Sequence, residues 1–355
     1  LWSARRTTGR PQRENSKREI RCDLRLIVQP TKMAKVTLSV RSTLLLASLL
    51  GPAAALSPAR TPQLPLLALR GGSRPAAPTP AAHQVFRNIE DEGARRCAEP
   101  SDKLFWKSIV AGACVGLGGT LCAGIGGDIG DVPFWAPGQG LKRFAFGAIG
   151  FPLSIALVAL TGSSAWTGNL PMVGAALRAG KADLASAARL LGINYAGCFV
   201  GTVLLGMLTA FAALPAAMPT IGISLHKLEL TGLQTLLRGV GGGALISLAI
   251  TLANCAVQSG GSVADVVVAV FLPIMTYVAC DFEHVLANFY FFASAICAGG
   301  ELALAPVLRN LLFSTAGNLI GACALGGYFL TWANGPVAAE PEKRVEAAAA
   351  PGGGA

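Results

Sequence analysis

Three ionisable side chains fall within four consecutive positions of a long apolar stretch: Asp281, Glu283 and His284. Apolar residues flank them over 266–280 and 285–297, which argues against the alternative that the group ends a membrane span and reaches water. A charged group in a bilayer costs about 2.5–3.5 kcal/mol on insertion scales, so its presence indicates function. An imidazole can hold or lend a proton near neutral pH, and Glu283 is predicted to orient the ring of His284.

A second polar stretch, residues 161–169, reads Thr-Gly-Ser-Ser-Ala-Trp-Thr-Gly-Asn and follows an apolar segment. The two polar stretches occupy corresponding places in two halves of the chain. Interrupted helices at matching positions of two halves indicate a binding site near the membrane midplane. The N-terminus of a half-helix carries partial positive charge, which favours an anion. The pattern therefore predicts an anion path.

The body of the chain consists of apolar segments long enough to cross a bilayer as helices. With 52% hydrophobic and 14% charged residues, the chain falls well below the roughly 25% charge of soluble domains. Dense glycine and alanine predict close helix packing. We expect an all-α integral membrane protein with six spans, at about 104–126, 143–162, 188–213, 231–255, 264–297 and 305–331.

The first hundred residues have a different composition. Residues 33–55 resemble a signal peptide, and residues 56–82 are rich in Pro, Ala and Arg, as in a transit peptide. We interpret 1–100 as a targeting presequence and disordered region, 101–333 as the membrane domain and 334–355 as a disordered tail. A bipartite presequence predicts a plastid envelope; a plain secretory signal followed by a linker, and hence the plasma membrane, is the alternative.

Four features in unbroken order over about residues 100–332 resemble the formate/nitrite transporter family. The segment Asp281-Phe-Glu-His-Val-Leu-Ala-Asn-Phe-Tyr290 is similar to the family's G-F-E-H-S-[IV]-A-N-M. Trp166-Thr-Gly-Asn169 is similar to F-T-G-N, and the segment 310–318 to N-L-[LI]-P-V-T-L-G-N. Lys103 and Lys227 stand where the family carries vestibule lysines.

The resemblance implies a homopentamer of aquaporin-like six-helix protomers, with an inverted repeat of spans 1–3 and 4–6 and broken helices 2 and 5. Each protomer would have its own pore for formate, nitrite, hydrosulfide or lactate. The implied pore residues are the central His284, the constrictions at Phe151, Ile155 and Trp166 on one side and Tyr277 on the other, Thr167 as hydrogen-bond partner of the anion or the histidine, Asn169 and Asn288 at the breaks, and Lys103 and Lys227 in the vestibules.

Several positions depart from the family pattern: Gly243 replaces a common asparagine, and Trp166 and Tyr277 are wider than the usual phenylalanine. Asp281 replaces the usual glycine, Ser164 stands where many members have an acidic residue, and Arg238 lies where an apolar residue is usual. Arg238 is interpreted as a snorkelling side chain, with an added anion attractor as the alternative. These departures bear on substrate preference and leave the predicted fold unchanged.

The predicted function is passage of a small monovalent anion, nitrite foremost and formate as the alternative, with pH dependence or proton coupling through His284. Lipid and protons are the other expected partners. We expect no cofactor, no metal and no catalysis, because the nine cysteines lack zinc-site spacing and no nucleophile motif accompanies Glu283. Nucleic-acid binding is disfavoured, because the excess of Lys and Arg lies entirely within residues 1–103.

Overall fold

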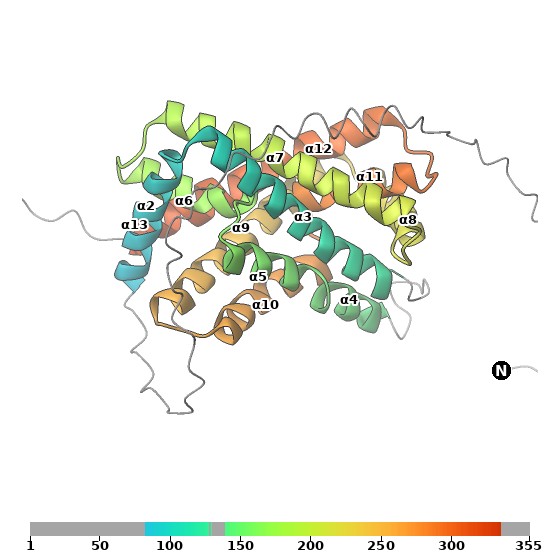
Figure 1. Ribbon diagram of the computed structural model, residues 1–355, viewed down its shortest axis with the longest axis horizontal. Coiled ribbons are helices and arrows are strands. Elements are labelled where there is room, and N and C mark those ends of the chain that lie inside the picture. The colour runs from blue at the N-terminus through green and yellow to red at the C-terminus, as the bar shows by residue number, and fades with distance from the viewer. Residues whose placement is uncertain (1–81, 128, 130–138, 335–355) are drawn as a thin grey trace, which may run out of the picture. The chain divides into compact units, whose positions relative to one another are not determined.

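The computed structural model describes residues 82–127, 129 and 139–334, and every regular element in that part of the chain is a helix (Figure 1). All of these residues belong to one compact unit, Ser73–Ala355. The signal and transit segments up to residue 81 and the tail after 334 lie outside the described residues. The helices are α2 (Ala82–Cys97), α3 (Ser101–Ile125), α4 (Gln139–Ala148), α5 (Phe151–Thr161), α6 (Trp166–Arg178), α7 (Leu184–Phe211), α8 (Ala217–Glu229), α9 (Gly232–Gln258), α10 (Val263–Ala279), α11 (Val285–Cys297), α12 (Leu304–Asn318), the π-helical η1 (Leu319–Phe329) and α13 (Leu330–Asn334).

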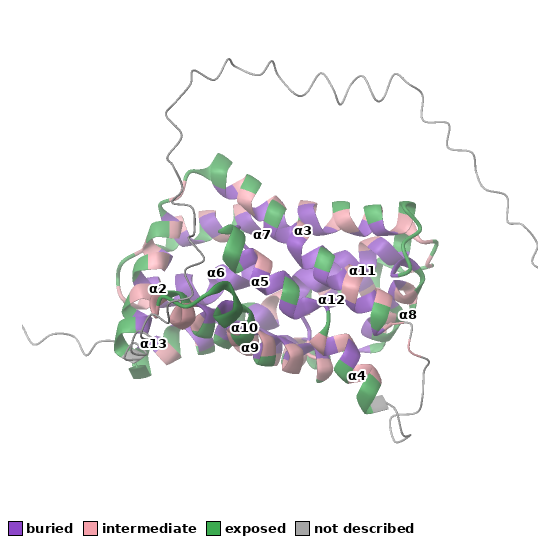
Figure 2. Cartoon of the chain, turned by 60° about the horizontal axis from the view of Figure 1, so that its bottom comes forward, coloured by how far each residue is buried: buried purple, intermediate pink, exposed green. Residues whose placement is uncertain are grey.

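Several stretches of the described chain are long and apolar enough to cross a membrane, as the all-α membrane class requires. They are Ser101–Ile125, Gly140–Thr161, Leu184–Phe211, Gly232–Gln258 and Leu304–Asn334. The segment expected to form the fifth span is divided into α10 and α11, which are shorter apolar helices. The outer helix faces carry large exposed hydrophobic side chains (Figure 2), so these faces suit lipid or another apolar surface.

Two short non-helical segments interrupt the helical chain within regions predicted to form single spans or polar stretches. The first interruption, residues 162–165, lies between α5 and α6, and the second interruption, residues 280–284, lies between α10 and α11. The first interruption is shorter than the polar stretch 161–169 in the sequence. Asn169 N donates to Ala165 O at 3.0 Å and Asn288 N to His284 O at 3.0 Å, so α6 and α11 begin directly after the interruptions.

The two halves of the unit make matching contacts. Helix α3 packs along α7 in the first half, as α9 packs along α12 in the second. Across the halves, α6 packs against η1 and α11 against α7. Close approach requires small residues: a Cβ on Gly201 would lie 2.0 Å from Ile109 O, and one on Gly321 would lie 2.0 Å from Val240 O. These contacts bring the starts of α6 and α11 into one interior.

Helix α2 corrects the expected boundary of the folded domain, because residues 82–97 lie inside the 1–100 segment assigned to a presequence and disordered region. Its apolar face is buried through Val85, Phe86 and Ile89, and α2 packs on α6. Glu90 on the same helix is 2% exposed and accepts from Arg178 Nη1 at 3.0 Å. Burial of this stripe, together with the ion pair, holds α2 to the bundle.

Candidate functional site

The starts of α6 and α11 meet at one buried polar contact. His284, which precedes α11 and is 2% exposed, has its Nε2 2.9 Å from Oγ1 of Thr167 in the first turn of α6. The other ring nitrogen, Nδ1, is buried and has no hydrogen-bond partner among the described residues. Neither helix has a side-chain N-cap within the described part of the chain. The contact therefore joins a titratable ring to two positive helix ends.

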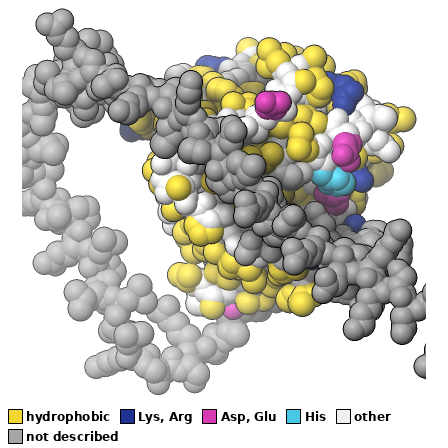
Figure 3. Space-filling view, turned by 90° about the vertical axis from the view of Figure 1, so that its right-hand side faces the viewer, with side chains coloured by type: hydrophobic (Ala, Val, Ile, Leu, Met, Phe, Trp, Pro, Cys, Tyr) yellow, Lys and Arg dark blue, Asp and Glu magenta, His cyan; other side chains and the backbone are white. Residues whose placement is uncertain are grey.

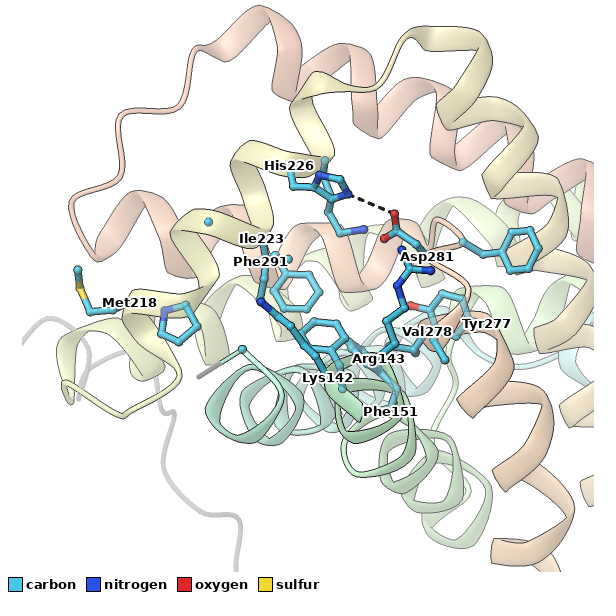
Figure 4. Close-up of a pocket in the computed structure, with 17 residues that line it drawn as sticks. Lys142, Arg143, Phe151, Met218, Ile223, His226, Tyr277, Val278, Asp281 and Phe291 are labelled. Carbon is cyan, nitrogen blue, oxygen red and sulfur yellow. Dashed lines mark hydrogen bonds and ion pairs between the residues drawn. The ribbon is translucent and has the colours of Figure 1, made fainter. Parts of the chain in front are cut away.

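Aromatic rings separate this histidine from the larger of two cavities. The first cavity, of about 590 Å³, is lined by residues of α4, α8 and α10 and by the second interruption (Figure 4). Tyr277 lines it and packs edge-on against the His284 ring, with centroids 5.7 Å apart. Phe151 packs edge-on against both Tyr277, at 6.1 Å, and Phe291, at 6.0 Å. An apolar wall thus stands between the first cavity and the histidine.

The grouping of aromatic residues differs from the expected one. Phe151 was expected to share a constriction with Trp166 and to lie opposite Tyr277, but it contacts Tyr277 and lines the same cavity. Trp166 is 4% exposed and packs on Tyr195, with centroids 5.1 Å apart. Ile155 is buried in the core and lines neither cavity. Phe151 and Trp166 thus contact different aromatic partners, which their order in the sequence does not show.

The second cavity, of about 170 Å³, is lined by residues of α2, α5, α6 and α9 and of the first interruption. Ala165, two residues before Thr167, and Gly168, directly after it, line the cavity together with Arg96 of α2. Arg96 Nη1 also donates to Asn169 Oδ1. Lys103, the residue expected in this vestibule, is exposed and lines neither cavity. The basic side chain at the second cavity is therefore Arg96.

The sequence interpretation missed Arg96 because it assigned residues before 101 to a presequence. A signal was present: the pair Arg95-Arg96 ends an amphipathic stretch that carries Glu92 at helical spacing. Arg96 Nε donates to Glu92 at 2.7 Å. Burial alone would raise the pKa of Glu92, but hydrogen bonds from Arg95 and the charge of Arg96 outweigh it and lower that pKa to about 2.

Glu283 is fully buried and does not orient the His284 ring as expected. Its Oε1 accepts from Lys227 Nζ at 2.7 Å, and its Oε2 accepts from Asn288 Nδ2 at 2.6 Å. Asn288 also donates to Asn310 Oδ1 at 2.8 Å. The carboxylate therefore neutralises the vestibule lysine, which is itself buried at 8% exposure, and the ring is held by Thr167 instead.

The corresponding network in the first half holds no carboxylate at the interruption, and its charged contact is the Arg96 guanidinium on Asn169 Oδ1. Asn169 Nδ2 donates to Ser164 Oγ at 2.8 Å and to Asn194 Oδ1 at 2.7 Å. Asn194 in turn donates to Ser164 O at 2.5 Å and to Ser108 Oγ at 2.7 Å. Asn169 and Asn288 thus brace the two interruptions through equivalent bonds to the third helix of each half.

Both interruptions are also fixed by the first helix of their half. Ser164 N donates to Lys107 O at 3.2 Å, and Glu283 N donates to Arg238 O at 3.2 Å. In the second interruption Asn318 adds Nδ2 bonds to Glu283 O and to Gly239 O. These backbone bonds fix the position of the residue just before each re-entering helix, and so the position of His284.

Arg238 is neither a snorkelling side chain nor an unpaired anion attractor. Its Nη1 pairs with Asp281 Oδ2 and donates to Asp281 O at 3.2 Å. His226 Nε2 lies 3.3 Å from the same Asp281 Oδ2. Figure 4 shows the His226–Asp281 contact at the edge of the first cavity, and Figure 3 shows charged and histidine side chains gathered on a face that is otherwise mostly hydrophobic.

A sequence profile of the formate/nitrite transporter family matches residues 83–332. "Formate-nitrite transporter 3" of Toxoplasma gondii is 25% identical over 256 residues, which are 70% of this chain and 50% of that protein. The match spans about half of the two Toxoplasma relatives found. "Formate channel BtFdhC" of Bacillus thuringiensis is 26% identical over 249 residues, 69% of this chain and 92% of that one.

Two solved structures share the fold. A chain described as an FNT family ion channel superposes with a TM-score of 0.62 at 22% identity, covering 70% of this chain and 98% of that chain. A pentameric formate channel with formate bound superposes with a TM-score of 0.54 at 22% identity, covering 66% and 98%. The profile covers well over half of the sequence and includes both interruptions and the polar contact between them. The chain therefore belongs to the formate/nitrite transporter family.

Proposed function

We propose that this protein is a membrane channel or transporter for a small monovalent anion, which passes the buried contact between His284 and Thr167. In this proposal α4–α5 with α6 form the second span, and α10 with α11 form the fifth span, of a six-span protomer with an inverted repeat. The observation that carries the proposal is a titratable ring with a buried nitrogen that has no partner among the described residues. The ring packs on Tyr277, which lines the first cavity, and contacts Thr167, which lies between the cavity-lining Ala165 and Gly168 in the chain.

The apolar wall determines what the histidine must do. A bare anion loses its hydration when it leaves either cavity, and transfer of an uncompensated charge into an apolar region is strongly unfavourable. Basic side chains at the cavities raise the local anion concentration. At the contact, the His284 ring supplies a proton or a hydrogen bond, and Thr167 holds the ring in register with the path. Passage then depends on pH through the ring.

Nitrite is the first candidate anion and formate is the second. Nitrite follows from the plastid presequence hypothesis, which rests on residues outside the described part of the chain. Formate is supported by the Bacillus relative named as a formate channel and by the solved formate channel that shares the fold. The pentameric state of that channel supports assembly of five protomers. The plastid envelope as location follows from the presequence hypothesis alone, with the plasma membrane as the alternative.

The test is uptake of nitrite and of formate into proteoliposomes between about pH 5 and 8, for the wild type and for His284→Phe. We expect anion flux without chemical turnover, with a pH dependence that the variant loses. Preferential nitrite uptake would support the nitrite assignment, and a formate preference would remove it while keeping the site. A variant with an unchanged pH profile would refute the role of His284, and turnover of the anion without flux would refute transport.

A further inference from the structure

Asp281 adopts a backbone conformation that a residue with a side chain rarely takes. Its φ is +59°, in the left-handed region. The equivalent position of the first interruption, two residues before the residue bonded to the first helix of its half, is Gly162 with φ +66°. A glycine takes this conformation without strain, and aspartate takes it at some cost. A strained residue beside a cavity points to a role for its side chain.

The Asp281 carboxylate lies where an anion would meet it. Asp281 lines the first cavity together with Lys142, Arg143, His226 and Lys227. An acidic group in such a place repels an anion unless its charge is cancelled. The Arg238 guanidinium, bonded to both the carboxylate and the carbonyl of Asp281, cancels it.

His226 makes the charge of this cluster depend on pH. The Asp281 carboxylate faces its Nε2 at 3.3 Å, and Glu229, on the same helix, lies 3.7 Å from its Nδ1. Lys227 follows it on α8, and Lys142 and Arg143 of α4 line the same cavity. The hydrogen bond to Asp281 raises the pKa of His226, against the opposing effect of burial. Protonation thus adds one positive charge within reach of neutral pH.

We propose that Asp281, Arg238 and His226 together set the affinity for the anion at the mouth of the first cavity, with His226 as the titrating member. The inference rests on the proposed function. The cluster is neutral when His226 is neutral and carries one positive charge when His226 is protonated. Anion capture at this mouth therefore strengthens as pH falls, separately from any effect of His284 on the rate of passage.

Charge substitutions give opposite effects if this is correct. Arg238→Leu leaves the carboxylate uncompensated and should raise the KM for nitrite or formate by about two- to fivefold at low ionic strength. Asp281→Asn, which keeps a side chain tolerant of positive φ, should lower the KM by a similar factor. The double variant Arg238→Leu/Asp281→Gly should return the KM close to the wild-type value.

Screening separates this role from a structural one. Between about 0.01 M and 1 M salt the Debye length falls from roughly 30 Å to 3 Å, so the KM differences should shrink while the maximum rates stay similar. Asp281→Gly relieves backbone strain and removes the charge, whereas Asp281→Asn only removes the charge. An equal KM in these two variants assigns the effect to charge. Arg238→Lys should keep the wild-type KM and serves where the leucine variant does not assemble.

The role of His226 is tested through the pH dependence of the KM. In the wild type the KM should fall from pH 8 to pH 6; in His226→Gln it should stay flat, while the pH dependence of the maximum rate persists. His83→Gln, at an exposed site on α2, is the matched control and should behave as the wild type. Salt-insensitive losses of maximum rate, with unchanged KM in every variant, would overturn the inference alone. A wild type that carries neither anion would overturn it together with the proposed function.

Discussion

The two interruptions share the same arrangement of hydrogen bonds, but the side chains within them differ in charge. In each, a backbone N–H bonds to the first helix, an asparagine in the first turn of the re-entering helix bonds to an asparagine of the third helix, and a basic side chain borders a cavity. The first interruption places Ser164 where the second places Glu283, and Gly162 where the second places Asp281. Equivalent hydrogen-bond arrangements therefore hold an interruption without ionisable residues in one half and an interruption with two ion pairs in the other.

This difference separates the contacts that both interruptions share from the contacts that only one of them makes. Backbone bonds and asparagine pairs recur in both halves, so they hold the helix ends whatever the charge. Within the interruptions, carboxylates occur in the second half, where Glu283 pairs with the buried Lys227 and Asp281 pairs with Arg238. In the first half the Arg96 guanidinium pairs with Glu92 of its own helix. Each of these carboxylates thus neutralises a basic side chain.

The largest expected effect on stability comes from removal of the buried carboxylate of Glu283. Glu283→Gln leaves Lys227 buried without a counter-charge, and removal of one partner of a buried pair costs about 3–5 kcal/mol. Ser164→Ala at the equivalent position removes one neutral hydrogen bond and should cost about 1 kcal/mol. The thermal unfolding midpoint of the detergent-solubilised protein checks both. Equal midpoint shifts would show that the halves do not differ in this way.

Glycines packed near the two interruptions provide a second contrast. A Cβ on Gly242 would lie 2.4 Å from Glu283 O, whereas a Cβ on Gly168 would lie no closer than 3.5 Å to Ile250 Cδ1. Gly242→Ala should therefore displace the second interruption and cost about 1–3 kcal/mol. Gly168→Ala should fold as the wild type. The midpoint of unfolding and the yield of assembled protein measure both, and a tolerated Gly242→Ala would contradict the close contact.

The contact between His284 and Thr167, which joins the two halves, can be tested by substitution of Thr167. Thr167→Val keeps the shape and removes the bond to His284, and one hydrogen bond of about 1–1.5 kcal/mol corresponds to roughly a tenfold change in anion flux. Thr167→Ser retains the hydroxyl and should keep most of the flux. Uptake into proteoliposomes is the measurement. Equal flux in the valine and serine variants would show that the hydroxyl does not position the ring.

The smallest expected effects concern the pH dependence of stability, where the halves should respond in opposite directions. The raised pKa of His226 means that its bond to Asp281 stabilises below about pH 6.5 and is lost as pH rises. The lowered pKa of Glu92, about 2, means that its bonds to Arg95 and Arg96 stabilise above about pH 4.5 and are lost as pH falls toward 2.

Unfolding midpoints against pH test this pair. The difference between the wild type and His226→Gln should be present at pH 5.5 and absent at pH 8.5. It should be at most about a few tenths of a kcal/mol, because the His226 side chain is 58% exposed and solvent screens the pair. The difference between the wild type and Glu92→Gln should be present at both values and disappear only in acid. A His226 effect that grows with pH would contradict the assigned contact.

The sequence alone determined the membrane class, the family resemblance and the cluster at 281–284, because hydropathy and short motifs are local properties. It also marked Asp281 and Arg238 as departures, yet it did not show that each answers the other, since they lie 43 positions apart. It placed Lys103 at a vestibule and excluded α2 from the fold, because neither burial nor contact can be read from composition.

Only the tertiary structure determined which side chains contact one another. Glu283 and His284 are adjacent in sequence, but their side chains have different partners. The carboxylate contacts Lys227 and Asn288, while the ring contacts Thr167. Those partners come from α8, α11 and α6, and the packing of the two halves alone brings them together. The sequence supplies the polar and ionisable side chains of the site. Helix packing determines which of them are neighbours, because hydrogen bonds and ion pairs act over a few ångströms in space.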